Sequence, residues 1–165
     1  MTDKHLTCTC GQVELRVSGP PILAAACYCD DCQAGAGQLS DLGASPSVIG
    51  ADGGTPYVLQ RKDRIGWLAG EHLLQRHKLR HGTATNRITT ACCNTPMLVD
   101  FDRGPHWVAI YQSRLDPAPP MEMLVNTRFA PADAVLPNGV PAYRTFPPRF
   151  VGKLIASRLA MLFGR

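Results

Sequence analysis

The cysteines of the 165-residue sequence fall into three short groups, whose types and spacing suit the binding of a metal ion. The groups are Cys8 with Cys10, then Cys27, Cys29 and Cys32, and finally the adjacent pair Cys92 and Cys93. A short turn that carries two cysteines can place both sulfur atoms on one zinc ion, and two such turns can share an ion. Because an odd number of thiols cannot all form disulfides within one chain, and a reducing cytosol disfavours disulfides, we interpret the groups as metal ligands.

The spacing of the groups predicts one or two zinc ions in sites of different kinds. We assign the first and third groups to one site, with Cys8, Cys10 and Cys93 as ligands and Cys92 as a fourth candidate. The middle group supplies three thiols of its own. Three protein ligands with an open position are typical of catalytic zinc, whereas four ligands are typical of structural zinc. We therefore predict a catalytic zinc tripod at Cys27, Cys29 and Cys32, with the small residues 34–37 leaving room beside the ion.

Composition and charge limit the classes of function. Apolar residues make up 45% of the sequence and charged residues 18%, a balance typical of a globular protein, and the length suits a single domain over residues 1–165. The net charge of +4 is too small to predict a nucleic-acid partner. We see neither a secretory signal at the beginning nor an apolar run long enough for a membrane span, so we expect a cytoplasmic protein without a membrane partner.

The pattern of apolar residues predicts a mainly β fold. Val13, Leu15 and Val17 alternate with polar residues, which indicates a strand with one buried face. We expect further strands at residues 22–27, on both sides of Lys62-Asp63, and on both sides of residues 102–105, with a turn-rich loop at 43–56. Residues 71–93 could begin with a turn or two of helix, but their β-branched second half favours a strand.

The C-terminal part of the sequence, residues 116–165, differs in composition and in its pattern of apolar residues from the predicted core at about 6–115. Residues 130–148 carry five prolines and should run as extended coil. Residues 149–165 form the one clear helix of the sequence, with an apolar face made by Val151, Leu154, Ile155, Leu159, Leu162 and Phe163. We expect this amphipathic helix to pack on its own domain or on a second subunit of a homodimer, rather than on a membrane.

Three segments of the sequence resemble the family of glutathione-dependent formaldehyde-activating (GFA) enzymes, which includes centromere protein V-like proteins. The segments are CTCGQVEL, CYCDDCQAGAG and CCNTPML, and their order and spacing match over roughly residues 6–112. The resemblance implies an antiparallel β-tent zinc-binding fold. It also implies a structural zinc from the first and third segments, a labile or catalytic zinc from the middle one, and a reaction that joins formaldehyde and glutathione through a carbon–sulfur bond.

The third segment departs from the family pattern C-x-x-C-G-[ST]-P. When Thr95-Pro96 is aligned with the [ST]-P of the pattern, Cys93 falls on the second cysteine of the pattern. The first cysteine of the pattern then falls on Thr90, and a threonine cannot supply a thiolate. Cys92 could substitute only if a turn or bulge directed both neighbouring thiols to one ion; otherwise it is a buried free thiol. The pairing of CYCDDCQ with CCNTP places the chain with a subgroup of the family rather than with the enzyme that gives the family its name.

We therefore carry three hypotheses of function. The first is a zinc-dependent carbon–sulfur lyase-like enzyme that acts on glutathione-type thiol adducts of small aldehydes, so that its partner is a small-molecule thiol or thiol adduct. The alternatives are a non-catalytic zinc-stabilised binding module and a thiol redox sensor. Glutathione as substrate would bring two carboxylates, for which a basic rim could come from Arg61, Lys62 and Arg64 or from Arg76, Lys78 and Arg80.

Overall fold

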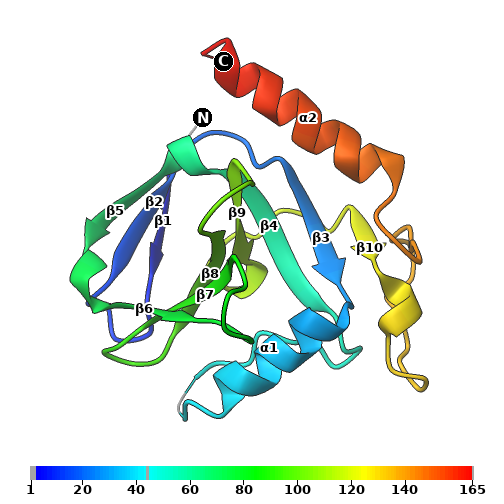
Figure 1. Cartoon of the computed structure of the whole chain (residues 1–165), viewed down its shortest axis with the longest axis horizontal. Coiled ribbons are helices and arrows are strands. Elements are labelled where there is room, and N and C mark those ends of the chain that lie inside the picture. The colour runs from blue at the N-terminus through cyan, green and yellow to red at the C-terminus, as the bar shows by residue number, and fades with distance from the viewer. Residues whose placement is uncertain (1–2, 44, 165) are drawn as a thin grey trace.

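The structure is a computed structural model that describes residues 3–43 and 45–164 (Figure 1). Within these residues it contains a smaller and a larger β-sheet and two α-helices. The smaller sheet is antiparallel, and its strand order is β1 (Lys4–Thr7), β2 (Glu14–Val17) and β5 (Ile65–Ala69). None of the helices in the described ranges is long and apolar enough to span a membrane.

The larger sheet supplies most of the framework. Its strand order is β10 (Met123–Val125), β3 (Leu23–Cys27), β4 (Thr55–Arg61), β9 (Trp107–Tyr111), β8 (Pro96–Phe101), β7 (Thr85–Thr90) and β6 (Leu74–His77). Neighbouring strands are antiparallel, except that β10 runs parallel to β3. The predicted mainly β, largely antiparallel fold is therefore confirmed.

Most strands lie where the sequence pattern places them. The alternating segment forms β2, the segment 22–27 forms β3, and β4 and β5 flank a 3₁₀ turn at Lys62–Arg64. The ambiguous segment 71–93 contains a single 3₁₀ turn, Glu71–Leu73, followed by β6 and β7. Two further 3₁₀ turns, Gln112–Arg114 and Thr127–Phe129, follow β9 and β10.

The first α-helix, α1 (Asp30–Ser40), is absent from the sequence prediction, which recognised only the C-terminal helix. Asp30 and Asp31 lie in its first turn, where negative charge is favourable near the helix N-terminus. Two glycines weaken its helix propensity and interrupt its apolar pattern, which explains why it was missed. Gly35 does not leave open room as we expected, because a Cβ atom there would lie 1.8 Å from Nε of Arg87.

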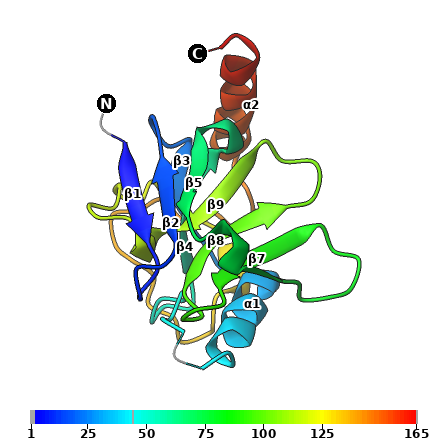
Figure 2. The ribbon, with the colours of Figure 1, turned by 90° about the vertical axis from the view of Figure 1, so that its left-hand side faces the viewer.

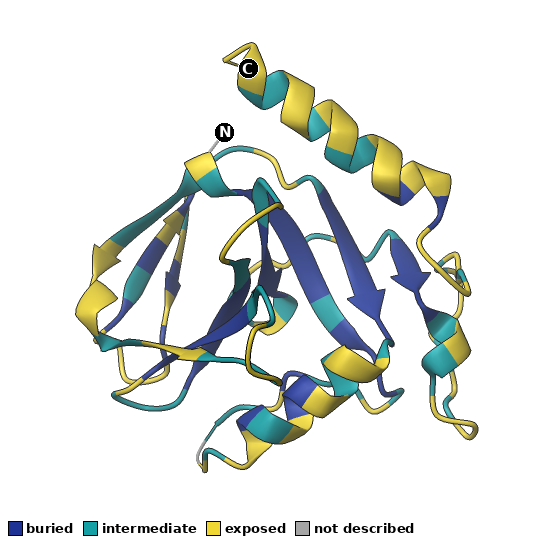
Figure 3. Cartoon of the chain, viewed as in Figure 1, coloured by how far each residue is buried: buried dark blue, intermediate teal, exposed yellow. Residues whose placement is uncertain are grey.

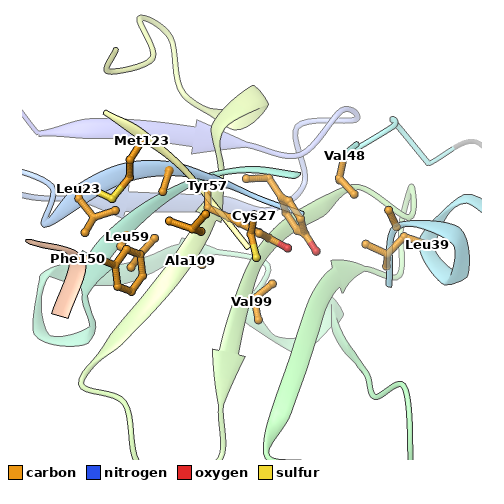
Figure 4. Close-up of a cluster of buried hydrophobic side chains, with 14 residues drawn as sticks. Leu23, Cys27, Leu39, Val48, Tyr57, Leu59, Val99, Ala109, Met123 and Phe150 are labelled. Atoms are coloured by element: carbon orange, nitrogen blue, oxygen red, sulfur yellow. The ribbon is translucent and has the colours of Figure 1, made fainter. Parts of the chain in front are cut away.

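The apolar core lies on both faces of the larger sheet. Along β4, Val58 points into a cluster shared with the smaller sheet, while Tyr57 and Leu59 point into a second cluster on the opposite face. This second cluster also contains Cys27, and Phe150 of the C-terminal helix packs into it (Figure 4). Because both faces are covered, β3 and β4 are almost entirely buried (Figure 3).

The C-terminal helix, α2 (Pro148–Leu162), crosses the end of the molecule opposite to α1 (Figures 1 and 2). Proline at the first helical position suits this start, because that residue needs no backbone donor. The helix is attached through Phe150, which is 7% exposed, and through ion pairs of Arg149 and Lys153 with Glu122. Ser157 adds a hydrogen bond to His106 at 3.0 Å.

The predicted apolar face of α2 is mostly not covered by its own chain. Leu154 is half-buried against the core, but the other members of that face are exposed: Val151, Ile155, Leu159, Leu162 and Phe163. The expectation that this face packs on its own domain is therefore wrong for these residues. The spacing of apolar residues along the sequence identifies an amphipathic helix, but it does not determine how closely the helix approaches the sheet.

The close approach of Arg87 to α1 yields a prediction about two glycines of the same helix. Gly35→Ala should destabilise the protein by about 1–2 kcal/mol, because its methyl group displaces the buried guanidinium from its hydrogen bond. Gly37→Ala should instead stabilise it by about 0.5–1 kcal/mol, because a Cβ there meets nothing within 4 Å. Urea unfolding of both variants measures the difference; equal effects at the two positions would contradict this view of the packing.

Candidate metal centres

The first and third cysteine groups meet at the junction of the two sheets. Cys8 and Cys10 lie in the loop between β1 and β2, and Cys92 and Cys93 in the turn between β7 and β8. The Sγ atoms of Cys8 and Cys10 are 3.5 Å apart, those of Cys8 and Cys92 are 3.8 Å apart, and all four lie within 4.8 Å of one another. Zinc–sulfur bonds of 2.3 Å in a tetrahedron place sulfurs about 3.8 Å apart, so the four donors fit a zinc ion.

A tight turn brings the adjacent thiols of Cys92 and Cys93 into the same cluster. Residues 91–93 form this turn, and Asn94 completes it with a φ of 51° in the left-handed region. The turn thus brings both neighbouring thiols to one cluster, which is what a ligand role for Cys92 requires. Burial disfavours ionisation of Cys93, but hydrogen bonds with Thr90 and Thr95 lower its pKa to about 5. Thr90 therefore contacts a thiol of the cluster rather than replacing one.

The middle group forms a second cluster where β3 passes into α1. Cys27 is the last residue of β3, Cys29 is the N-cap residue of α1, and Cys32 lies in its first turn. The Sγ atoms of Cys27 and Cys29 are 3.4 Å apart, and all three lie within 4.8 Å of one another. The helix start holds Cys29 and Cys32 on the same side, since residues three apart on a helix are neighbours. The two cysteine clusters could thus each bind a metal ion.

Side chains from distant strands surround the three-thiol cluster. The hydroxyl of Tyr57 donates to Sγ of Cys32 at 3.8 Å, and Nδ2 of Asn126 donates to Sγ of Cys27 at 3.5 Å. Hydrogen bonds with Cys29 and Cys32 lower the pKa of Cys27, while the interaction with Cys27 raises the pKa of Cys32. The close approach of the three thiols therefore favours ionisation of Cys27 over that of Cys32.

A cavity of about 540 Å³ opens beside the three-thiol cluster, within the size range of small-molecule sites. Its walls are mainly apolar, and they come from both the larger sheet and the C-terminal helix. Representative wall residues are Leu59, Val99, Phe101, Trp107, Phe150 and Leu154. The rings of Phe101 and Trp107 meet edge to face, with their centroids 4.8 Å apart, which fixes this part of the wall.

The charged side chains that line the cavity are Asp31, Arg80 and Arg87. Arg80 forms an ion pair with Asp31 at 2.7 Å, and both residues are exposed. Arg87 is only 4% exposed and donates to the backbone carbonyl of Asp31. In residues 3–43 and 45–164, no carboxylate forms an ion pair with Arg87, so its buried positive charge faces the cavity without an acidic partner.

Most residues of the expected basic rim form ion pairs away from the cavity. Lys62 and Arg76 pair with Asp100, Lys78 pairs with Asp102, and Arg61 pairs with Asp63. Of the six basic residues considered from the sequence, only Arg80 lines the cavity.

No sequence motif marks Tyr57, Arg87 or Asn126 as residues of the site. Each reaches it from a different strand or strand end, and none stands in a motif. The one local signal is Asn126, because asparagine tolerates the left-handed φ of 58° that it adopts after β10.

Comparison with known proteins supports the resemblance seen in the cysteine segments. The model of the family described as "glutathione-dependent formaldehyde-activating enzyme" matches residues 3–129. Among solved structures, the chain is similar to a Rhodobacter sphaeroides protein determined by crystallography as a structural genomics target, with 15% identity and a TM-score of 0.49. That similarity covers 85% of this chain and 99% of the other. None of the curated proteins compared with the chain shows a significant match.

The two clusters lead to a prediction about metal content. Native mass spectrometry of the purified chain should find two zinc ions, one for each set of thiols. Cys32→Ser should bind one ion and keep most of the stability. Cys93→Ser should also bind one ion, but with a clearly lower melting temperature, because the four-thiol cluster joins the two sheets. Unchanged metal content in both variants would contradict the assignment of these cysteines as ligands.

Proposed function

Because the chain belongs to the glutathione-dependent formaldehyde-activating enzyme family, we propose that it catalyses the reversible addition of a glutathione-type thiol to an aldehyde. The reaction forms or breaks one carbon–sulfur bond, as in a carbon–sulfur lyase. The observation that carries this proposal is the three-thiol cluster of Cys27, Cys29 and Cys32 beside a cavity of about 540 Å³. The four-thiol cluster, by contrast, has a complete donor set for a tetrahedral ion, which is typical of a structural site.

A three-thiol site leaves a coordination position for a reactant. A zinc ion bound there would supply Lewis-acid chemistry, polarising the aldehyde oxygen or favouring the thiolate form of the thiol. The protein's own contribution is to hold and orient its ligands. Tyr57 and Asn126 contact two of the three sulfurs, and such outer contacts fix ligand direction and strength.

The addition step balances without an oxidant or a reductant. The sulfur of the thiol bonds to the aldehyde carbon, and the proton of the thiol ends on the former carbonyl oxygen. The reverse step returns that proton and breaks the carbon–sulfur bond. The cavity promotes both directions by holding the thiol and the aldehyde together, which converts an encounter between two molecules into a reaction within one complex.

The charges around the cavity suit an anionic thiol. Three thiolates around a divalent ion leave one net negative charge, which the buried guanidinium of Arg87 would offset. Arg80 is exposed and lines the cavity, so it could exchange its partner Asp31 for a carboxylate of glutathione.

We further propose that the protein works in the cytoplasm, where its seven free cysteines would stay reduced. Its partner there would be a small-molecule thiol or thiol adduct. The exposed apolar residues of α2 make a homodimer a further proposal, because a second chain could cover them.

The proposal is tested by the exchange rate between an aldehyde and its glutathione adduct, measured by NMR exchange spectroscopy with formaldehyde and with longer aldehydes. The zinc-loaded protein should accelerate exchange, and Cys32→Ser should reduce the acceleration by at least about a hundredfold through loss of a metal ligand. Ala34→Ser is the matched control and should keep full activity, because this position on the same helix is exposed and does not line the cavity. Zinc-loaded protein that accelerates none of these exchanges would favour a non-catalytic binding module.

A further inference from the structure

The cavity beside the three-thiol cluster is larger and less polar than formaldehyde requires. The carbon of formaldehyde carries only hydrogen atoms, and the rest of its glutathione adduct is a peptide with two carboxylates and an ammonium group. A peptide of that kind needs polar partners. The charged side chains of the cavity, Asp31, Arg80 and Arg87, come only from α1, β7 and the segment between β6 and β7.

The rest of the cavity offers an apolar surface that glutathione itself would not satisfy. Cys27 and Phe150 belong to one apolar cluster, so an apolar surface connects the thiols to α2 (Figure 4). Leu59 belongs to the same cluster, and Phe101 and Trp107 pack against this cluster. A substituent on the reacting carbon that points towards α2 would therefore contact apolar side chains such as Leu59, Phe150 and Leu154.

The helix α2 forms one wall and part of the rim of this apolar half. Phe150 and Leu154 face the cavity, while Val151 and Phe146 also line it and are 45% and 49% exposed. Exposed apolar side chains at the rim of a cavity are typical of a site that admits an apolar ligand. The family match ends at residue 129, so this wall comes from a part of the chain that the match does not include.

We infer that the cavity binds the thiol adduct of a bulky apolar aldehyde, with an alkyl chain or an aromatic ring in place of the hydrogen of formaldehyde. The glutathione part lies towards Arg80 and Arg87, and the apolar substituent lies between the sheet and α2. This inference rests on the proposed function and names its substrate class.

Binding of stable thioethers tests the inference without any turnover. Isothermal titration calorimetry of the zinc-loaded full chain compares S-hexylglutathione with S-methylglutathione. Each buried methylene group favours binding, so the hexyl compound should bind at least about tenfold more tightly. Val151→Asp places a charge on the rim and should remove most of that advantage. Ile155→Asp, on the same helix and 56% exposed but outside the cavity, should keep it.

The outcomes separate this inference from the proposed function. Equal affinity for the two thioethers would overturn the apolar substrate class and leave thiol-adduct chemistry standing. Loss of the advantage in both aspartate variants would also overturn it, because the effect would not come from the cavity. Hexane-1-thiol serves as a third ligand. Suppose that neither thioether binds, but that hexane-1-thiol binds and Val151→Asp weakens its binding. In that case the apolar site stands and the glutathione part of the proposed function fails. Binding of none of the three compounds would overturn the inference.

Discussion

The convergence of Cys8, Cys10, Cys92 and Cys93 constrains the rest of the structure, because it ties together two sheets that share no strand. The contact is not made by sulfur alone, since the backbone of Thr9 also donates to the hydroxyl of Thr95 at 3.0 Å. These contacts hold the turn between β7 and β8, and Thr85 and Arg87 of β7 line the cavity beside the second cysteine cluster. The strand β7 therefore connects the turn of the four-thiol cluster with the cavity.

Arg87 is the link between β7 and the three-thiol cluster. Its buried guanidinium reaches α1, donates to the carbonyl of Asp31 and packs where Gly35 lacks a side chain. Since Cys29 is the N-cap residue of α1 and Cys32 lies in its first turn, this contact bears on the placement of two of the three thiols. The same guanidinium supplies positive charge to the cavity, so Arg87 both packs against α1 and sets the charge of the site. A buried cation of this kind is costly unless an anion lies close by.

Much of the fold could be predicted from the sequence, because it depends on local patterns. Alternation along residues 12–18 indicates β2, and the apolar period of residues 149–165 indicates α2. The failures have physical causes. The two glycines of α1 interrupt the helical pattern, so the sequence does not predict this helix, and β10 has only three residues, too few for a recognisable alternation. The exposure of the α2 face depends on how far the helix stands from the sheet, which no periodicity encodes.

For the candidate site, the sequence by itself determined the groups of thiols, because two or three cysteines within six residues must stay close whatever the fold. It also indicated a family through the order of those groups. Only the tertiary structure decided that Cys92 turns towards Cys8, that Tyr57, Arg87 and Asn126 surround the three-thiol cluster, and that α2 closes an apolar cavity. These contacts join residues far apart in the chain, and their geometry follows from strand order and packing, which short-range patterns do not specify.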